Sequence, residues 1–126
     1  MNLLTKELRG RLPPLCSQDG KGDAAIVCVK FFTPDSSWTW YVLEGGPVYD
    51  ADEGIAKAVG VEANLEETDF LFFGLVDGHE VELGYFSLAE LATATGPLGL
   101  HIERDKFWKP KTLGEVRAEI SARHAA

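Results

Sequence analysis

The apolar residues near the N-terminus recur every four positions, which is the spacing of one face of a helix. Leu4, Leu8 and Leu12 follow this spacing and predict a short helix at 6–12. Thr5 is placed to cap its first turn, and two prolines follow the last leucine. Because the residue before a proline avoids helical backbone angles, we expect the helix to end there.

Apolar and aromatic runs separated by a polar turn predict two strands in the N-terminal half. Residues 25–33 are almost continuously apolar, which is typical of a strand covered on both faces. After a Pro-Asp-Ser-Ser turn, residues 38–44 predict a second strand, in which Trp38 and Trp40 lie on one face. We expect the Gly-Gly-Pro sequence at 45–47 to break this strand.

Two segments lack a clear periodic pattern. Residues 17–23 are polar and rich in glycine but lack the GxxxxGK[ST] arrangement of a phosphate-binding loop, so they predict a connector. Residues 46–68 are acidic and thinly apolar, although 50–59 fit a short amphipathic helix with acids in its first turn. A connection of this length is typical of a functional or mobile insertion.

The clearest hairpin joins residues 70–76 to residues 80–86 through an Asp-Gly turn. In its second strand apolar residues alternate with Glu80, Glu82 and Gly84. This alternation predicts one face toward the core and one toward solvent. The predicted core face consists of Val81, Leu83 and Tyr85.

Two capping boxes predict the remaining helices. Ser87 with Glu90 begins a short helix that a Gly-Pro pair ends, and Thr112 with Glu115 begins a longer C-terminal helix. The apolar stripe of the last helix is Leu113, Val116 and Ile120. We therefore expect an α+β fold, an antiparallel sheet of four or more strands with N-terminal and C-terminal helices packed on it.

Length and composition favour one domain spanning 1–126, since a single core commonly serves about 100–150 residues. No apolar run is long enough to cross a bilayer, and charges interrupt the first ten residues too early for a signal peptide. We expect a cytoplasmic protein with no membrane contact. Two cysteines and three histidines show no ligand spacing, so we expect no metal site and no cofactor.

The net charge of −8 is unevenly distributed. Residues 44–90 carry twelve acidic residues and one basic residue, Lys57, and therefore a charge of −11. The rest of the chain is mildly basic. This acidic middle is either a solvated face that aids solubility or a surface that repels or imitates nucleic acid.

Four stretches of sequence together resemble the DUF2958 family of small bacterial proteins. They are LLTKELRGRLPPL at 3–15, KGDAAIVCVKFFTPDSSWTWYVLEG at 21–45, DFLFFGLVDGHEVELGYFSLAEL at 69–91 and GPLGLHIERDKFWKPKTLGEV at 96–116. The family name records a domain of unknown function, so the resemblance implies no activity and no catalytic residue. It implies an association with plasmids and integrative conjugative elements.

The first candidate for a binding surface is the segment 104–111, in which basic and aromatic residues are interleaved. Its members are Arg104, Lys106, Phe107, Trp108, Lys109 and Lys111. Basic residues can neutralise phosphates while aromatic rings stack on bases. Alternatively, the two rings seal the core beneath the last helix and the lysines are solvated.

The second candidate is the pair Trp38 and Trp40, which would form a stacking or protein-binding platform if exposed and part of the core if buried. The third is a carboxylate and histidine site for metal-dependent or acid–base chemistry. Its members would be Asp35, Glu44, Asp69, Asp77, His79, Glu80 and Glu82. No HExxH, GxSxG or CxxC pattern supports such chemistry.

We expect a non-catalytic accessory protein of mobile elements that binds a protein or nucleoprotein partner, with nucleic acid as one candidate ligand. Two alternatives stay open: an acidic DNA mimic of the antirestriction type, and an enzyme such as a metal-dependent hydrolase or nuclease. The sequence does not indicate the oligomeric state or the identity of the partner.

Overall fold

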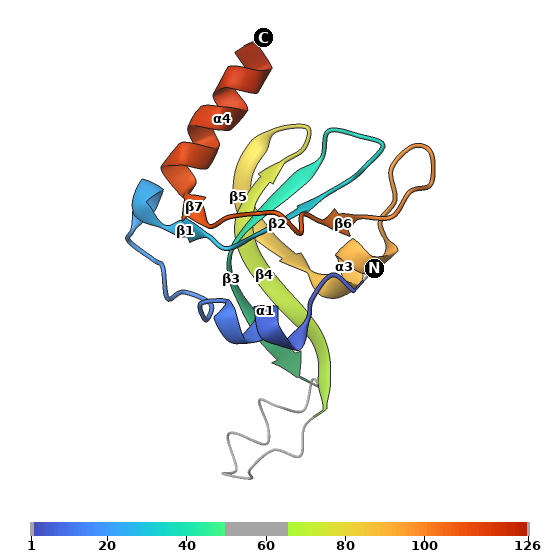
Figure 1. Cartoon of the computed structure of the whole chain (residues 1–126). Coiled ribbons are helices and arrows are strands. Elements are labelled where there is room, and N and C mark those ends of the chain that lie inside the picture. The colour runs from blue at the N-terminus through green and yellow to red at the C-terminus, as the bar shows by residue number, and fades with distance from the viewer. Residues whose placement is uncertain (1, 50–65, 126) are drawn as a thin grey trace.

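The structure is a computed structural model that describes residues 2–49 and 66–125. Short helices and strands surround a twisted antiparallel sheet, and the C-terminal helix projects from one side of it (Figure 1). The helices are α1 (Lys6–Arg11), the 3₁₀ helix η1 (Gly22–Ala24), α3 (Leu88–Thr93) and α4 (Leu113–Ala125). The strands are β1 (Ile26–Val27), β2 (Val29–Phe32), β3 (Thr39–Tyr49), β4 (Glu67–Asp77), β5 (Val81–Ser87), β6 (Glu103–Arg104) and β7 (Lys111–Thr112).

The five-stranded sheet has the order β5-β4-β3-β2-β6, and every pair in it is antiparallel. β1 and β7 form a separate two-stranded sheet. The predicted α+β fold, with an antiparallel sheet and helices at both ends of the chain, is confirmed.

The prediction of one strand over 25–33 is wrong, because the chain changes sheets at Cys28. Val27 pairs with Lys111 of β7, whereas Val29 pairs with Val42 of β3. Both valines are buried, but they belong to the hydrophobic clusters on opposite faces of the large sheet. The apolar run is almost continuous because its first residues pack into one hydrophobic cluster and its later residues pack into the other.

The prediction that 45–47 breaks the second strand is also wrong. β3 continues through these residues, and Gly45 pairs with Phe72 while Pro47 pairs with Phe70. A Cβ at Gly45 would lie 2.6 Å from Cε1 of Phe70, so glycine lets this ring pack against the strand. Pro47 lacks an N–H, and this costs little here because β2 pairs only with the first part of β3.

Hydrophobic clusters cover both faces of the sheet. One cluster joins α1 and α3 to the sheet and contains the neighbouring rings of Phe31, Phe70, Phe72 and Phe86. The other joins α4 to the buried residues of β1, β3 and β4. Its helical side is the predicted stripe Leu113, Val116 and Ile120, which is confirmed as buried.

The predicted helix starts are confirmed in atomic detail. The hydroxyl oxygens of Thr5 and Ser87 accept hydrogen bonds from the backbone N–H groups of Leu8 and Glu90. The N–H of Glu115 donates to the hydroxyl of Thr112, and the carboxylate of Glu115 accepts from that residue in return. These bonds satisfy amide groups that the first turn of a helix leaves without partners.

The predicted hairpin is confirmed, but its apolar face is not part of the core. The exposed fractions of Val81, Leu83 and Tyr85 are 37%, 43% and 60%. Leu83 continues a cross-strand row with Tyr41 and Leu75, which are buried. Tyr41 and Leu75 belong to the cluster beneath α4, and β5 lies outside it.

The predicted helix at 50–59 lies outside the described residues, as does most of the acidic segment 46–68. Among the described helices, none combines the length and apolar character that a bilayer crossing requires.

Two glycines that face each other on β4 and β5 provide a matched test of the packing. A Cβ at Gly74 would lie 2.0 Å from the carbonyl oxygen of Tyr41, whereas one at Gly84 would meet nothing within 4 Å. Gly74→Ala should lower the free energy of unfolding by at least about 2 kcal/mol, because the backbone must shift. Gly84→Ala should raise it by roughly 0.5 kcal/mol, since alanine loses less backbone entropy. Urea unfolding measures both, and equal values would contradict this packing.

Candidate nucleic-acid interface

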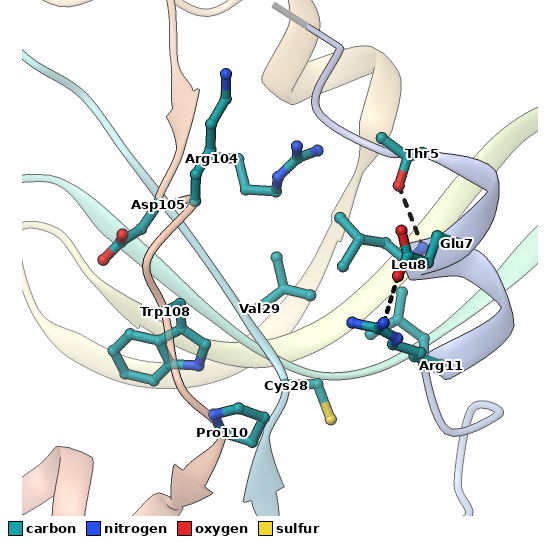
Figure 2. Close-up of a pocket in the computed structure, with 12 residues that line it drawn as sticks. Thr5, Glu7, Leu8, Arg11, Cys28, Val29, Arg104, Asp105, Trp108 and Pro110 are labelled. Carbon is teal, nitrogen blue, oxygen red and sulfur yellow. Dashed lines mark hydrogen bonds and ion pairs between the residues drawn. The ribbon is translucent and has the colours of Figure 1, made fainter.

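The segment 104–111 lies beside α1 and forms one wall of a pocket of about 420 Å³ (Figure 2). Thr5, Glu7, Leu8 and Arg11 of α1 and its cap form the opposite wall, where Glu7 and Arg11 make an ion pair. Cys28 and Val29 lie between the two walls, where the chain passes from the small sheet to the large one. The predicted site residues Arg104, Lys106 and Trp108 therefore line one hollow.

Trp108 joins the segment to the core. Its indole N–H donates to the carbonyl oxygen of Val27 over 3.0 Å, and its ring centroid lies 5.8 Å from that of Tyr41. The Nζ of Lys111 lies over the indole, 4.7 Å from its centroid. Trp108 is consequently half-buried, with one edge on the core and one edge on the pocket.

Phe107 has the opposite environment, although it is the neighbouring residue. Its side chain is 92% exposed. The carboxylate of Asp105 accepts from the N–H of Phe107 over 2.9 Å, and the carbonyl of Asp105 accepts from the N–H of Trp108. This turn separates the two rings, so the expectation that both seal the core holds for Trp108 and is wrong for Phe107.

Cations and carboxylates both lie near the exposed ring of Phe107. Lys106 and Lys109 flank the two aromatic residues and are exposed. A second hollow, of about 470 Å³, places Lys30 and Arg104 on the same side as Phe107. Glu103 and Asp105 also line it, and the Nζ of Lys30 lies 4.0 Å from a carboxylate oxygen of Asp105.

Arg104 has a structural role in addition to its place in both hollows. Its guanidinium donates to the carbonyl oxygens of Asn2 and Leu3 over 2.8 and 3.1 Å. These bonds fix the N-terminal residues against β6. Lys111 is held by Glu119 of α4, with 2.7 Å between Nζ and the carboxylate.

Trp38 and Trp40 form a separate site. As predicted they share one face, with ring centroids 5.9 Å apart, and both are half-buried. They line a hollow of about 480 Å³ together with Pro97. Trp40 pairs with Phe31, which in turn pairs with Arg104, so one strand separates this hollow from the basic segment.

The residues of the candidate carboxylate and histidine site are held by different parts of the fold. The buried carboxylate of Glu44 accepts from the N–H groups of Cys16 and Gln18, at 2.8 and 2.7 Å. Asp69 accepts from the N–H of Ala89 at the start of α3, and Asp35 accepts from that of Leu98.

Asp77 and His79 also have separate partners. Asp77 is buried and lies 3.8 Å from Arg123 and 3.3 Å from His124. His79 instead packs its ring against Trp38, at a centroid distance of 5.1 Å. Within residues 2–49 and 66–125, no three His, Cys, Asp or Glu side chains are grouped in a way that could hold a metal ion.

The comparisons with known proteins give one finding. The model of a family described as a protein of unknown function, DUF2958, matches residues 47–125. The chain belongs to the DUF2958 family. The matched part of this DUF2958 protein includes β4, β5, α4 and the whole segment 104–111. No curated protein and no solved structure matches the chain.

The two cysteines should differ in reactivity. Burial raises the pKa of the Cys28 thiol, so less of it is thiolate at mildly alkaline pH, whereas Cys16 is exposed. A chromogenic disulfide reagent should therefore modify this DUF2958 protein in a fast and a slow phase. Cys16→Ser should remove the fast phase and Cys28→Ser the slow one. Loss of the fast phase in Cys28→Ser would contradict the assignment.

Proposed function

We propose that this DUF2958 protein is a non-catalytic interaction protein that binds single-stranded nucleic acid through the segment 104–111. The observation that supports this most is Phe107, a phenyl ring that is 92% exposed between the exposed side chains of Lys106 and Lys109. A large ring held in water is unfavourable for stability alone, and it is typical of a contact surface.

The chemistry of this surface fits the two parts of a nucleotide. A base can stack on the phenyl ring of Phe107, since every base has a flat π-face. Lys106 and Lys109 lie next to the ring in the chain and can neutralise the phosphates on either side of the stacked base. A single strand suits this arrangement better than a duplex, in which the bases are already stacked.

The pocket beside α1 gives the strand a path beyond Phe107. Arg104, Asp105 and Lys106 line both this pocket and the second hollow, so the two hollows adjoin the same part of the segment. The indole of Trp108 forms part of the pocket wall. We infer that the backbone of the bound strand follows these cations from Phe107 toward α1.

Glu103 and Asp105 line the second hollow, but the acidic residues of the β4–β5 hairpin lie away from this surface. Glu80 and Glu82 belong to the β5 end of the sheet, and the segment 104–111 begins at β6, the other end. A net charge of −8 repels nucleic acid in general, and it therefore favours approach through the basic end alone.

We place this activity in the cytoplasm, in the maintenance, transfer or defence biology of plasmids and integrative conjugative elements. The support for this context is the association that accompanies the family resemblance. The protein would then act as an accessory component of a nucleoprotein complex.

Fluorescence anisotropy of a labelled oligothymidylate, at low and moderate salt, tests the proposal. Phe107→Ala should weaken binding roughly tenfold, because one stacked base is lost. Lys109→Ala should weaken binding and reduce the slope of log K against log salt by about 0.7, the value for one phosphate on a single strand. Trp108→Ala should also weaken binding, but through loss of its contact with Val27 as well.

Two variants serve as matched controls. Leu98→Ala removes another exposed apolar side chain, and Lys21→Ala removes another exposed lysine, both outside the segment. Neither should change affinity by more than about twofold, since a contact distant from the nucleic acid contributes little. Absence of binding at high micromolar wild-type protein would refute the proposal, as would equal losses in the controls and in Phe107→Ala.

A further inference from the structure

The two edge strands of the large sheet differ in length. β6, at one edge, has two residues, and such a short strand offers little backbone for pairing. β5, at the other edge, has seven residues. In the described part of the chain no strand pairs with its outer side. β5 therefore presents a row of backbone N–H and C=O groups at the surface.

On the face of β5 that carries Val81, Leu83 and Tyr85, the side chains also lack the charges that usually protect an edge. Val81, Leu83 and Tyr85 form an exposed apolar row on the face that carries α4. The ring of Tyr85 extends this row over β4, where its centroid lies 4.9 Å from that of Phe73. An uncovered apolar row beside free backbone groups is the arrangement that accepts an added strand.

We propose that the outer edge of β5 binds an extended segment of a partner protein in which apolar and basic residues alternate. The partner strand would pair with β5 by backbone hydrogen bonds and continue the sheet. This inference concerns the edge opposite the segment 104–111, so it stands whether or not the protein binds nucleic acid.

Charge complementarity defines the sequence of the partner strand. Residues that alternate along β5 point to opposite faces, so Glu82 lies on the face opposite Val81, Leu83 and Tyr85. Side chains of paired residues in an added strand share a face with their counterparts. Lysine or arginine is therefore favoured beside Glu82, and apolar residues are favoured beside Leu83 and Tyr85.

Gly84 is a second observation that favours the approach of another chain to β5. A Cβ at this position would meet nothing within 4 Å, so packing within the described residues does not require glycine here. Glycine inside a strand often marks a place where another chain approaches closely. The open space lies on the same face as Glu82, where it would admit the long stem of a basic side chain.

A hollow of about 560 Å³ lies at the start of β5. It is bounded by Val81 on the sheet side and by Ile120 and His124 on α4. It continues the apolar row of β5 toward the helix. The first apolar residue of the added strand would occupy it, and this fixes which end of β5 the partner covers.

The charge of β5 disfavours a second copy of the chain as the occupant. If β5 paired with β5 of another copy with the apolar rows on one face, the Glu82 side chains of both molecules would lie on the other face of the joined sheet. Like charges on neighbouring strands destabilise the pairing. A basic strand avoids this repulsion.

A labelled heptapeptide of alternating lysine and valine is the probe that tests this proposal. This peptide should bind the full chain in fluorescence anisotropy. A control peptide of the same composition, with all lysines at one end, should bind at least about fivefold more weakly, because it cannot place lysines on one face of the sheet and valines on the other. Amide exchange, followed by NMR, should slow for residues 81–87 when the alternating peptide is bound. Protection elsewhere but not in β5 would overturn the proposal.

Charge reversal distinguishes strand pairing from general attraction to an acidic protein. Glu82→Lys should weaken the lysine–valine peptide about fivefold and strengthen a glutamate–valine peptide by a similar factor. Glu90→Lys makes the same charge change on an exposed residue of α3 and should alter neither. Equal effects of the two variants would overturn the proposal. So would a dimer, seen by sedimentation velocity, that Tyr85→Lys dissociates, because a second copy would then occupy the edge.

Discussion

The pairing of β3 with β4 is the constraint on which the other elements depend. Both strands have eleven residues, and their register brings the carbonyl of Tyr41 so close to Gly74 that only glycine fits. β2 and β5 are added to the two outer sides of this pair, and α4 packs over its buried Tyr41 and Leu75. β3 also holds the N-terminal segment in place, because the carboxylate of Glu44 accepts hydrogen bonds from two backbone N–H groups of the loop after α1.

The sequence predicted the features that depend on neighbouring residues. The caps of α1, α3 and α4 are interactions over three residues, and the β4–β5 hairpin is a contact between adjacent strands, so both leave a local pattern. The errors concern tertiary structure. Whether Gly45 ends a strand depends on the ring of Phe70, and whether Leu83 is buried depends on where α4 lies; neither relation is visible in a local pattern.

In the candidate interface, too, some features could be read from neighbouring residues and others depend on tertiary contacts. Interleaved basic and aromatic residues indicated the segment 104–111, but not which ring faces solvent. The deciding contact is local, since Asp105 accepts from the N–H of Phe107 and its carbonyl accepts from Trp108. An aspartate side chain commonly accepts from the backbone N–H two residues on, so Asp105 was a turn signal that could have separated the roles of the two rings. The position of α1 beside this segment could not be inferred from a local pattern, because the two are about one hundred residues apart in the chain.

The separation of charge in the sequence becomes a separation in space. The basic segment begins at β6 and the acids of the hairpin lie on β5, at the far side of a five-stranded sheet. Separated charges of opposite sign orient a protein before contact as it diffuses toward a charged partner. Two ligands of opposite charge could then be held at once, with the sheet as a rigid spacer between them.

The hydrogen bonds from Arg104 to the backbone of Asn2 and Leu3 span about one hundred residues of sequence. Leu3 and Leu4 are buried in the cluster that also contains Ile102. During synthesis on the ribosome, these leucines cannot complete their native contacts until Ile102 and Arg104 have emerged. Residues 2–4 thus reach their native packing late, because contacts between residues so distant in sequence form slowly.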